Sequence, residues 1–128
     1  MDLNTVNVLV FAYLGDTIYE DYIRKYLIIN KKIPNVNDLQ KESINYVSAM
    51  SQANYLNKLI ENNFFTEEEL SVIRRARNYK SKSHPKSCDI VTYKHATALE
   101  AIIGYLELSS QQSRINELMK QILEGNLC

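Results

Sequence analysis

The chain has 128 residues, with 15 basic and 15 acidic side chains, two histidines, two cysteines and no tryptophan. This length fits one domain spanning residues 1–128, and the low glycine and proline content disfavours a turn-rich β-sandwich. A net charge of zero argues by itself against a histone-like nucleic-acid binder. The cysteines and histidines lack the spacing of a structural zinc site. No apolar run reaches the ~20 residues of a membrane span and no signal peptide is recognisable, so we expect a cytoplasmic protein without a membrane partner.

Apolar residues recur at helical spacing through most of the chain, and no stretch alternates as a β-strand does. The first predicted helix runs from Val6 to Ile29. Gly15 lies inside it, where glycine costs ~1 kcal/mol relative to alanine. The sequence therefore predicts a specific reason for a small residue at this position. A connector follows at residues 30–34.

The second helical tract is predicted to begin at Asn37, which forms a pattern resembling a capping box with Gln40. It continues to about Asn62 and is expected to bend near residues 48–51. One long tract with a bend is thus the prediction for this part of the chain.

Thr66 and Glu69 form a clearer capping box and predict the start of the next helix, which should end near Asn78. Residues 79–91 show no apolar periodicity and are rich in serine, so we expect a loop there.

Two further helices complete the predicted fold. Thr92 is expected to cap a helix that runs to about Leu108, and Ser110 to start a last helix that ends at Gly125. These elements predict an all-α fold, a compact bundle of five to seven helices.

Basic side chains are concentrated in one short segment. Six of the fifteen lie within positions 74–86, where there is no acid, and the rest of the chain carries nine basic and fifteen acidic residues. A basic helix end that runs into a polar loop suits contacts with phosphate groups. The candidate RNA contacts are Arg74, Arg75, Arg77, Asn78, Lys80, Lys82, His84 and Lys86. A solvated loop would give the same pattern, so this segment alone leaves a nucleic-acid role open.

Two carboxylates stand at unusual places. Asp16 follows Gly15 in the apolar first helix, and Glu100 lies among small and apolar residues four positions before Gly104. A charge in such surroundings is rarely fully buried unless it is paired or bound to a metal. If the two helices pack together, the carboxylates approach and repel, and Mg²⁺ would relieve the repulsion. Otherwise each acid is an ordinary exposed or capping residue.

Several segments resemble the ribonuclease III family. The stretch Phe11–Glu20 resembles the signature helix of its catalytic domain, whose core reads ExLEFLGD, and Glu100–Gly104 resembles its second signature, EAxxG. The small branch known as Mini-ribonuclease III gives a fuller match. Its further motifs correspond in order to Asn45–Ala49, Arg74–Ser81, Pro85–Tyr93 and Ala96–Leu106.

The resemblance implies a ribonuclease III endonuclease-domain helical bundle with Mg²⁺ as its cofactor. It further implies a homodimeric endoribonuclease that cleaves double-stranded RNA, leaves 5′-phosphate and 3′-hydroxyl ends, and matures the paired ends of the 23S ribosomal RNA precursor. Asp16 and Glu100 correspond to catalytic, metal-binding acids of the family. Two further acids of the larger enzymes correspond to Ala12 and Thr97, as they do in the Mini branch. Glu20 is a candidate supporting acid, and a ribosomal protein is a candidate helper.

From the length of 128 residues we expect no separate double-stranded-RNA-binding domain like that of the larger enzymes. The basic segment is therefore expected to hold the RNA. Two alternatives remain open. One is a non-catalytic RNA-binding dimer of the same fold that acts in ribosome assembly, and convergence of Asp16 and Glu100 would favour the enzyme over it. The other is a helical protein-interaction module, which would lack the salt-dependent RNA affinity of a phosphate binder.

Overall fold

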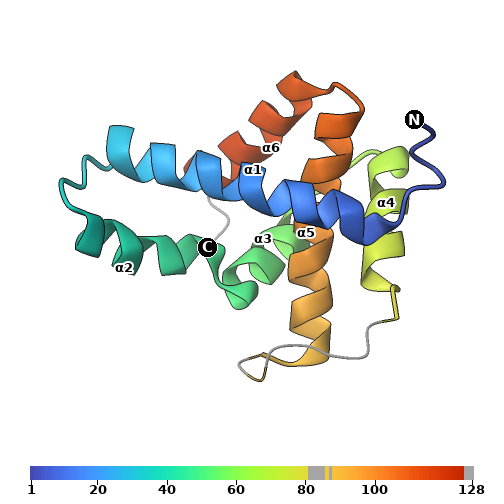
Figure 1. Ribbon diagram of the computed structural model, residues 1–128, viewed down its shortest axis with the longest axis horizontal. Coiled ribbons are helices and arrows are strands. Elements are labelled where there is room, and N and C mark those ends of the chain that lie inside the picture. The colour runs from blue at the N-terminus through green and yellow to red at the C-terminus, as the bar shows by residue number, and fades with distance from the viewer. Residues whose placement is uncertain (81–85, 87, 126–128) are drawn as a thin grey trace.

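A computed structural model of the chain describes residues 1–80, 86 and 88–125. These residues form helices and no strand, so the predicted all-α class is confirmed (Figure 1). The helices are α1 (Val8–Ile29), α2 (Val36–Val47), α3 (Ala49–Glu61), α4 (Glu67–Arg77), α5 (Ile90–Leu108) and α6 (Gln112–Glu124). Within the described part of the chain, no helix has the length and apolar character needed to cross a bilayer.

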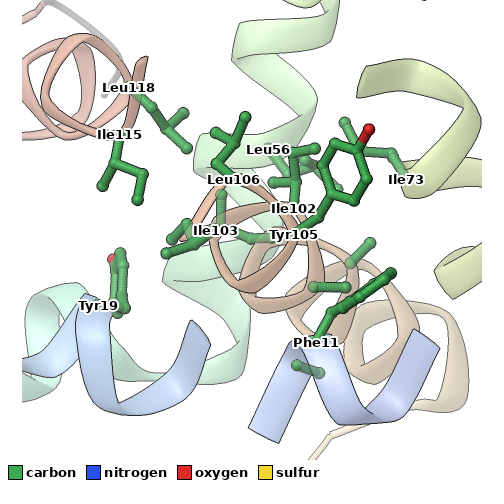
Figure 2. Close-up of a cluster of buried hydrophobic side chains, with 14 of the residues drawn as sticks. Phe11, Tyr19, Leu56, Ile73, Ile102, Ile103, Tyr105, Leu106, Ile115 and Leu118 are labelled. Carbon is green, nitrogen blue, oxygen red and sulfur yellow. The ribbon is translucent and has the colours of Figure 1, made fainter. Parts of the chain in front are cut away.

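Helix α5 forms the centre of the fold. Every residue from 101 to 106 is buried, and a helix that is apolar around its whole circumference is stable only when it is covered on all sides. Helices α1, α3, α4 and α6 provide that cover. Figure 2 shows the α5 side chains pointing toward Phe11 and Tyr19 of α1, Leu56 of α3 and Ile73 of α4.

The approach of α1 to α5 depends on two glycines. A Cβ atom built on Gly15 would lie 1.7 Å from the carbonyl oxygen of Glu100, and one built on Gly104 would lie 1.8 Å from that of Phe11. The backbones of the two helices are therefore in direct contact, which only glycine permits. This contact explains why a residue that weakens a helix stands inside α1.

The capping box predicted at the start of α4 is confirmed. The Thr66 hydroxyl accepts a hydrogen bond from the Glu69 backbone N–H at 3.1 Å, and the Glu69 carboxylate accepts one from the Thr66 backbone N–H at 2.9 Å. The helix ends where predicted, with Asn78 as its C-cap.

Helices α2 and α5 begin earlier than predicted. Asn35, not Asn37, caps α2, because its side-chain oxygen accepts from the Asp38 backbone N–H at 2.9 Å. Asp89, not Thr92, caps α5, accepting from the Thr92 backbone N–H at 2.8 Å and from its hydroxyl at 3.0 Å. In both helices the true cap lies two or three residues before the residue chosen from the sequence.

The bend expected near residues 48–51 is a complete helix break. Ser48 adopts an extended conformation with ψ 152° and is both the C-cap of α2 and the N-cap of α3. Its hydroxyl accepts from the Ser51 backbone N–H at 3.2 Å. From α1, the buried Tyr19 hydroxyl donates to the Tyr46 carbonyl at 2.6 Å and so ties this corner to the core.

The first and last helices also differ slightly from prediction at their starts. Helix α1 begins two residues late, at Val8, after Asn7 accepts from the Leu9 backbone N–H at 2.8 Å. Helix α6 begins at Gln112, because Ser110 turns the chain with a φ of 59°. Gly125 ends α6 as predicted.

Candidate active site

Asp16 and Glu100 meet where α1 crosses α5. The contact of Gly15 with the Glu100 carbonyl oxygen places the two acids on adjacent backbones, and their carboxyl groups lie within hydrogen-bonding reach of each other. Asp16 is exposed, whereas Glu100 is partly buried. The structure thus brings together two acids that are 84 positions apart in the sequence.

The environment of Glu100 opposes its ionisation. Burial is the largest cause, followed by the hydrogen bond with Asp16 and by the negative charge of that residue, with a smaller contribution from Glu20. The Gln52 amide acts in the opposite direction, because it favours the charged form and lowers the pKa. Together these effects raise the pKa of Glu100 to about 8, so its carboxyl group is largely protonated at neutral pH when no cation is bound.

This donor set fits a magnesium ion. Two carboxylates that repel each other gain from a divalent cation, and Mg²⁺ is bound through one or two carboxylates together with water and substrate phosphate. No cluster of three or more His, Cys, Asp or Glu side chains suited to a metal occurs among residues 1–80, 86 and 88–125. Ala12 offers no ligand, and the Thr97 hydroxyl donates to the Tyr93 carbonyl at 2.9 Å. Ala12 and Thr97 thus add no carboxylate to the pair formed by Asp16 and Glu100.

Glu100→Gln should stabilise the metal-free protein at alkaline pH. The folded-state pKa of Glu100, about 8, lies above its ordinary value of 4.5, so the stability contributed by this group is present below that ordinary value and is lost as the pH rises toward 8. Glutamine does not ionise, and the advantage of the variant should grow by about 2 kcal/mol between pH 5 and pH 9, less than full linkage because water reaches the site. Urea unfolding in EDTA at both pH values measures this difference, and an advantage independent of pH would contradict the assigned environment.

A buried glutamine, which the sequence analysis missed, also contacts this site. Gln52 in the first turn of α3 is only 4% exposed, and its amide favours the ionised form of the Glu100 carboxyl group. Its side-chain nitrogen also donates to the Val47 carbonyl at 3.1 Å. A signal was present in the sequence, because Gln52 shares the inward phase of Leu56 and Leu59 at helical spacing.

The three arginines at the end of α4 differ in their exposure and in the contacts of their side chains. The Arg75 guanidinium donates to the Val6 carbonyl at 2.7 Å and lies over the Phe11 ring, so it ties α4 to the start of α1. Arg74 is exposed and lies 3.9 Å from Glu67, a weak surface pair. Arg77 is partly buried. Of the three, Arg75 already has a structural role in the free protein.

The remaining candidates for RNA contacts lie at or beyond the end of α4. Asn78, Lys80 and Lys86 are exposed, and the predicted contacts Lys82 and His84 lie outside the described residues.

A hollow of about 310 Å³ lies between the end of α4 and the start of α5, lined by Arg77, Asn78, Val91, Lys94 and His95. Burial and the charge of Arg77 lower the pKa of His95, so its ring is largely neutral at pH 7. His95 precedes Glu100 by five residues, about 8 Å along the helix axis.

Comparison with known proteins assigns the chain to a family. The model of the ribonuclease III domain matches residues 9–111, which include both acids and both interlocking glycines. The chain belongs to the ribonuclease III family. It is 47% identical over 127 residues to the Mini-ribonuclease 3 of Brevibacillus brevis, covering 97% of this chain and 92% of that protein. Membership of the ribonuclease III family identifies the chain as an endoribonuclease.

A further relative and a solved structure agree with this chain in sequence and in fold. The Mini-ribonuclease 3 of Staphylococcus aureus is 38% identical over 121 residues, covering 94% of this chain and 90% of that one. A crystal structure of a Fusobacterium nucleatum protein superposes with a TM-score of 0.84 at 34% identity, over 98% of this chain and 99% of that chain. The ribonuclease III helical fold predicted from the motifs is thus confirmed.

Proposed function

We propose that this ribonuclease III chain is a Mg²⁺-dependent enzyme that cleaves double-stranded RNA and matures the paired ends of the 23S ribosomal RNA precursor in the cytoplasm. The observation that carries the proposal is the convergence of Asp16 and Glu100 at a helix crossing where only glycine fits. The curated relatives named Mini-ribonuclease 3 support this branch of the family.

Asp16 and Glu100 would hold the metal, and the two residues have different surroundings. Exposed Asp16 faces the solvent side, from which a phosphate group can approach. Glu100 is partly buried, and the Gln52 amide favours its ionised form. Bound between them, Mg²⁺ would lower the pKa of a water ligand and offset negative charge on the phosphate. In the overall reaction, water adds to phosphorus, the bond to the 3′-oxygen breaks and that oxygen gains a proton, which leaves 5′-phosphate and 3′-hydroxyl ends.

The basic end of α4 and the loop beyond it would bind the RNA backbone. Arg74, Arg77, Asn78 and Lys80 lie along this end of the molecule, and Lys82, His84 and Lys86 follow in the sequence. A-form RNA is recognised mostly through its shape, its phosphates and its 2′-hydroxyls, so we expect selection by duplex geometry more than by sequence. A ribosomal protein could supply further selection.

A homodimer is the proposed assembly. Leu9, Val10 and Tyr13 expose apolar surface on one stretch of α1, and Tyr13 is 84% exposed. Neighbouring exposed apolar side chains of this size are typical of interaction surfaces. Sedimentation of the purified chain measures the assembly directly.

A long RNA duplex incubated with the chain tests the proposal. We expect cleavage with Mg²⁺ present, no cleavage in EDTA, and product ends that carry 5′-phosphate and 3′-hydroxyl groups. RNA binding in EDTA should weaken steeply as salt is raised, because the basic residues replace counterions on the phosphates. Salt-dependent binding without cleavage under any divalent metal would instead indicate a non-catalytic RNA-binding dimer, and loss of salt dependence would argue against phosphate contacts. Cleavage of a 23S precursor duplex at its mature ends tests the assigned substrate.

A further inference from the structure

Gln52 is a polar side chain in an apolar environment. It is 4% exposed, and its Oε1 atom is buried without a hydrogen-bond partner among the described residues. Leaving a buried polar atom unpaired is unfavourable, because the atom loses its hydrogen bonds to water. A methionine of similar size would avoid that cost, so the stability of the core does not explain this glutamine.

The orientation of the Gln52 carboxamide follows from its neighbours. The Val47 carbonyl can only accept, so the Nε2 atom of Gln52 must face it, at 3.1 Å. The Oε1 atom has no hydrogen-bond partner in the described part of the chain, and Gln52 lowers the pKa of Glu100. Only the N–H side of an amide favours a carboxylate in this way, so that side of the same group faces Glu100. One NH₂ group therefore binds the α2–α3 corner and faces the carboxyl group of Glu100.

Hydrogen bonds from α1 and within α3 hold the α2–α3 corner next to Gln52 in place. Tyr19 of α1 donates to the Tyr46 carbonyl at 2.6 Å, and Gln52 binds the next carbonyl along the chain, that of Val47. The Ser48 hydroxyl accepts from the Ser51 backbone N–H and donates to the Ser51 hydroxyl at 2.9 Å, which fixes the first turn of α3. The amide group is therefore presented to Glu100 from a rigid support.

We propose that Gln52 is a positioning residue for the metal site, which holds the Glu100 carboxylate beside Asp16 in the arrangement that binds Mg²⁺. This inference rests on the proposed function, because it presumes that the two acids hold the ion. Protein groups that orient a metal ligand through hydrogen bonds typically change metal affinity by about 10–100-fold when removed. Asp16 and Glu20, the two acids that raise the pKa of Glu100, cannot play this part, because ionised carboxylates only accept hydrogen bonds.

Mg²⁺ binding by the full chain tests the inference without reference to cleavage. Gln52→Met keeps the volume of the side chain and removes its N–H groups, and we expect the Mg²⁺ dissociation constant from calorimetric titration to rise at least about tenfold. The rise in melting temperature caused by Mg²⁺ should require correspondingly more of the ion. Gln40→Met, at an exposed position of α2, is the matched control and should bind Mg²⁺ as the wild type does.

A purely structural role would give a different result. It would lower the melting temperature in EDTA and leave the Mg²⁺ dissociation constant unchanged, and that outcome would overturn the inference. If Gln52→Met fails to fold, Gln52→Asn retains the amide but is one methylene too short to bridge both partners, and the same loss of affinity is expected. Absence of Mg²⁺ binding by the wild type would overturn the proposed metal site together with this inference. Unchanged affinity in the Gln52 variants would overturn the inference alone.

Discussion

Asp16→Asn should lower the rate of RNA cleavage by about three orders of magnitude and leave a folded protein that still binds duplex RNA. Asparagine keeps the size of the side chain but removes the charge that Mg²⁺ requires, and the stabilisation a metal gives a phosphoryl transition state is worth several kcal/mol, with each 1.36 kcal/mol a factor of ten in rate. Asp16 is exposed, so the change opens no cavity. Single-turnover cleavage at saturating Mg²⁺ and separate RNA-binding titrations in EDTA measure the two effects.

A neighbouring acid provides the control for that result. Asp21 lies on the same helix, is exposed and forms a surface pair with Lys25 at 2.9 Å. Asp21→Asn removes the same charge from α1 but not from the site, so the cleavage rate should stay within about twofold of the wild type. Mg²⁺-dependent cleavage that survives Asp16→Asn would overturn the assignment of Asp16 to the metal site.

The start of α4 could be predicted from the sequence because the two residues of its capping box lie within one helical turn. Thr66 and Glu69 form a reciprocal pair within one turn, and their capping box is readable without any tertiary information. The start of α2 was predicted wrongly because two asparagines were available. Asn35 is the cap because it also forms a side-chain pair with Asp38. The Asp38 carboxylate accepts a hydrogen bond from the Asn35 amide nitrogen at 2.9 Å. The tract around Ser48 contains no glycine or proline, so the sequence predicts only a bend there. The helix breaks instead because Ser48 is the N-cap of α3.

Part of the candidate site could also be predicted from the sequence. Asp16 and Glu100 stand out because each lies in an apolar helix close to a glycine, and the two glycines imply a close crossing. The contacts of Gln52 with Glu100 and of Arg75 with Val6 join residues far apart in sequence. Neither residue type is unusual in a polar segment, so only the three-dimensional packing reveals these contacts. Arg75 was accordingly grouped with the other basic residues, although its side chain already binds the backbone near the start of α1.

Gly15→Ala should destabilise the protein by more than about 3 kcal/mol, although helix propensity alone predicts a gain of ~1 kcal/mol. The added Cβ would lie 1.7 Å from the Glu100 carbonyl oxygen and 3.0 Å from the Gly104 nitrogen, and both atoms belong to the backbone of α5. Overpacking costs about 1–3 kcal/mol where side chains can move aside, and here a whole helix must move instead. Urea unfolding measures the loss.

The two glycines interlock, which makes relief of the clash costly. Moving α1 away at Gly15 also opens the contact between Gly104 and Phe11, and it separates the buried α1 side chains from the centre of the fold. The same movement draws Asp16 away from Glu100, so any folded fraction should also bind Mg²⁺ more weakly. Thr17→Ala introduces the same residue at an exposed position of α1 and should change stability by less than about 0.5 kcal/mol. A Gly15→Ala protein as stable as this control would contradict the crossing geometry, because α1 would then have room for a Cβ atom where the two backbones meet.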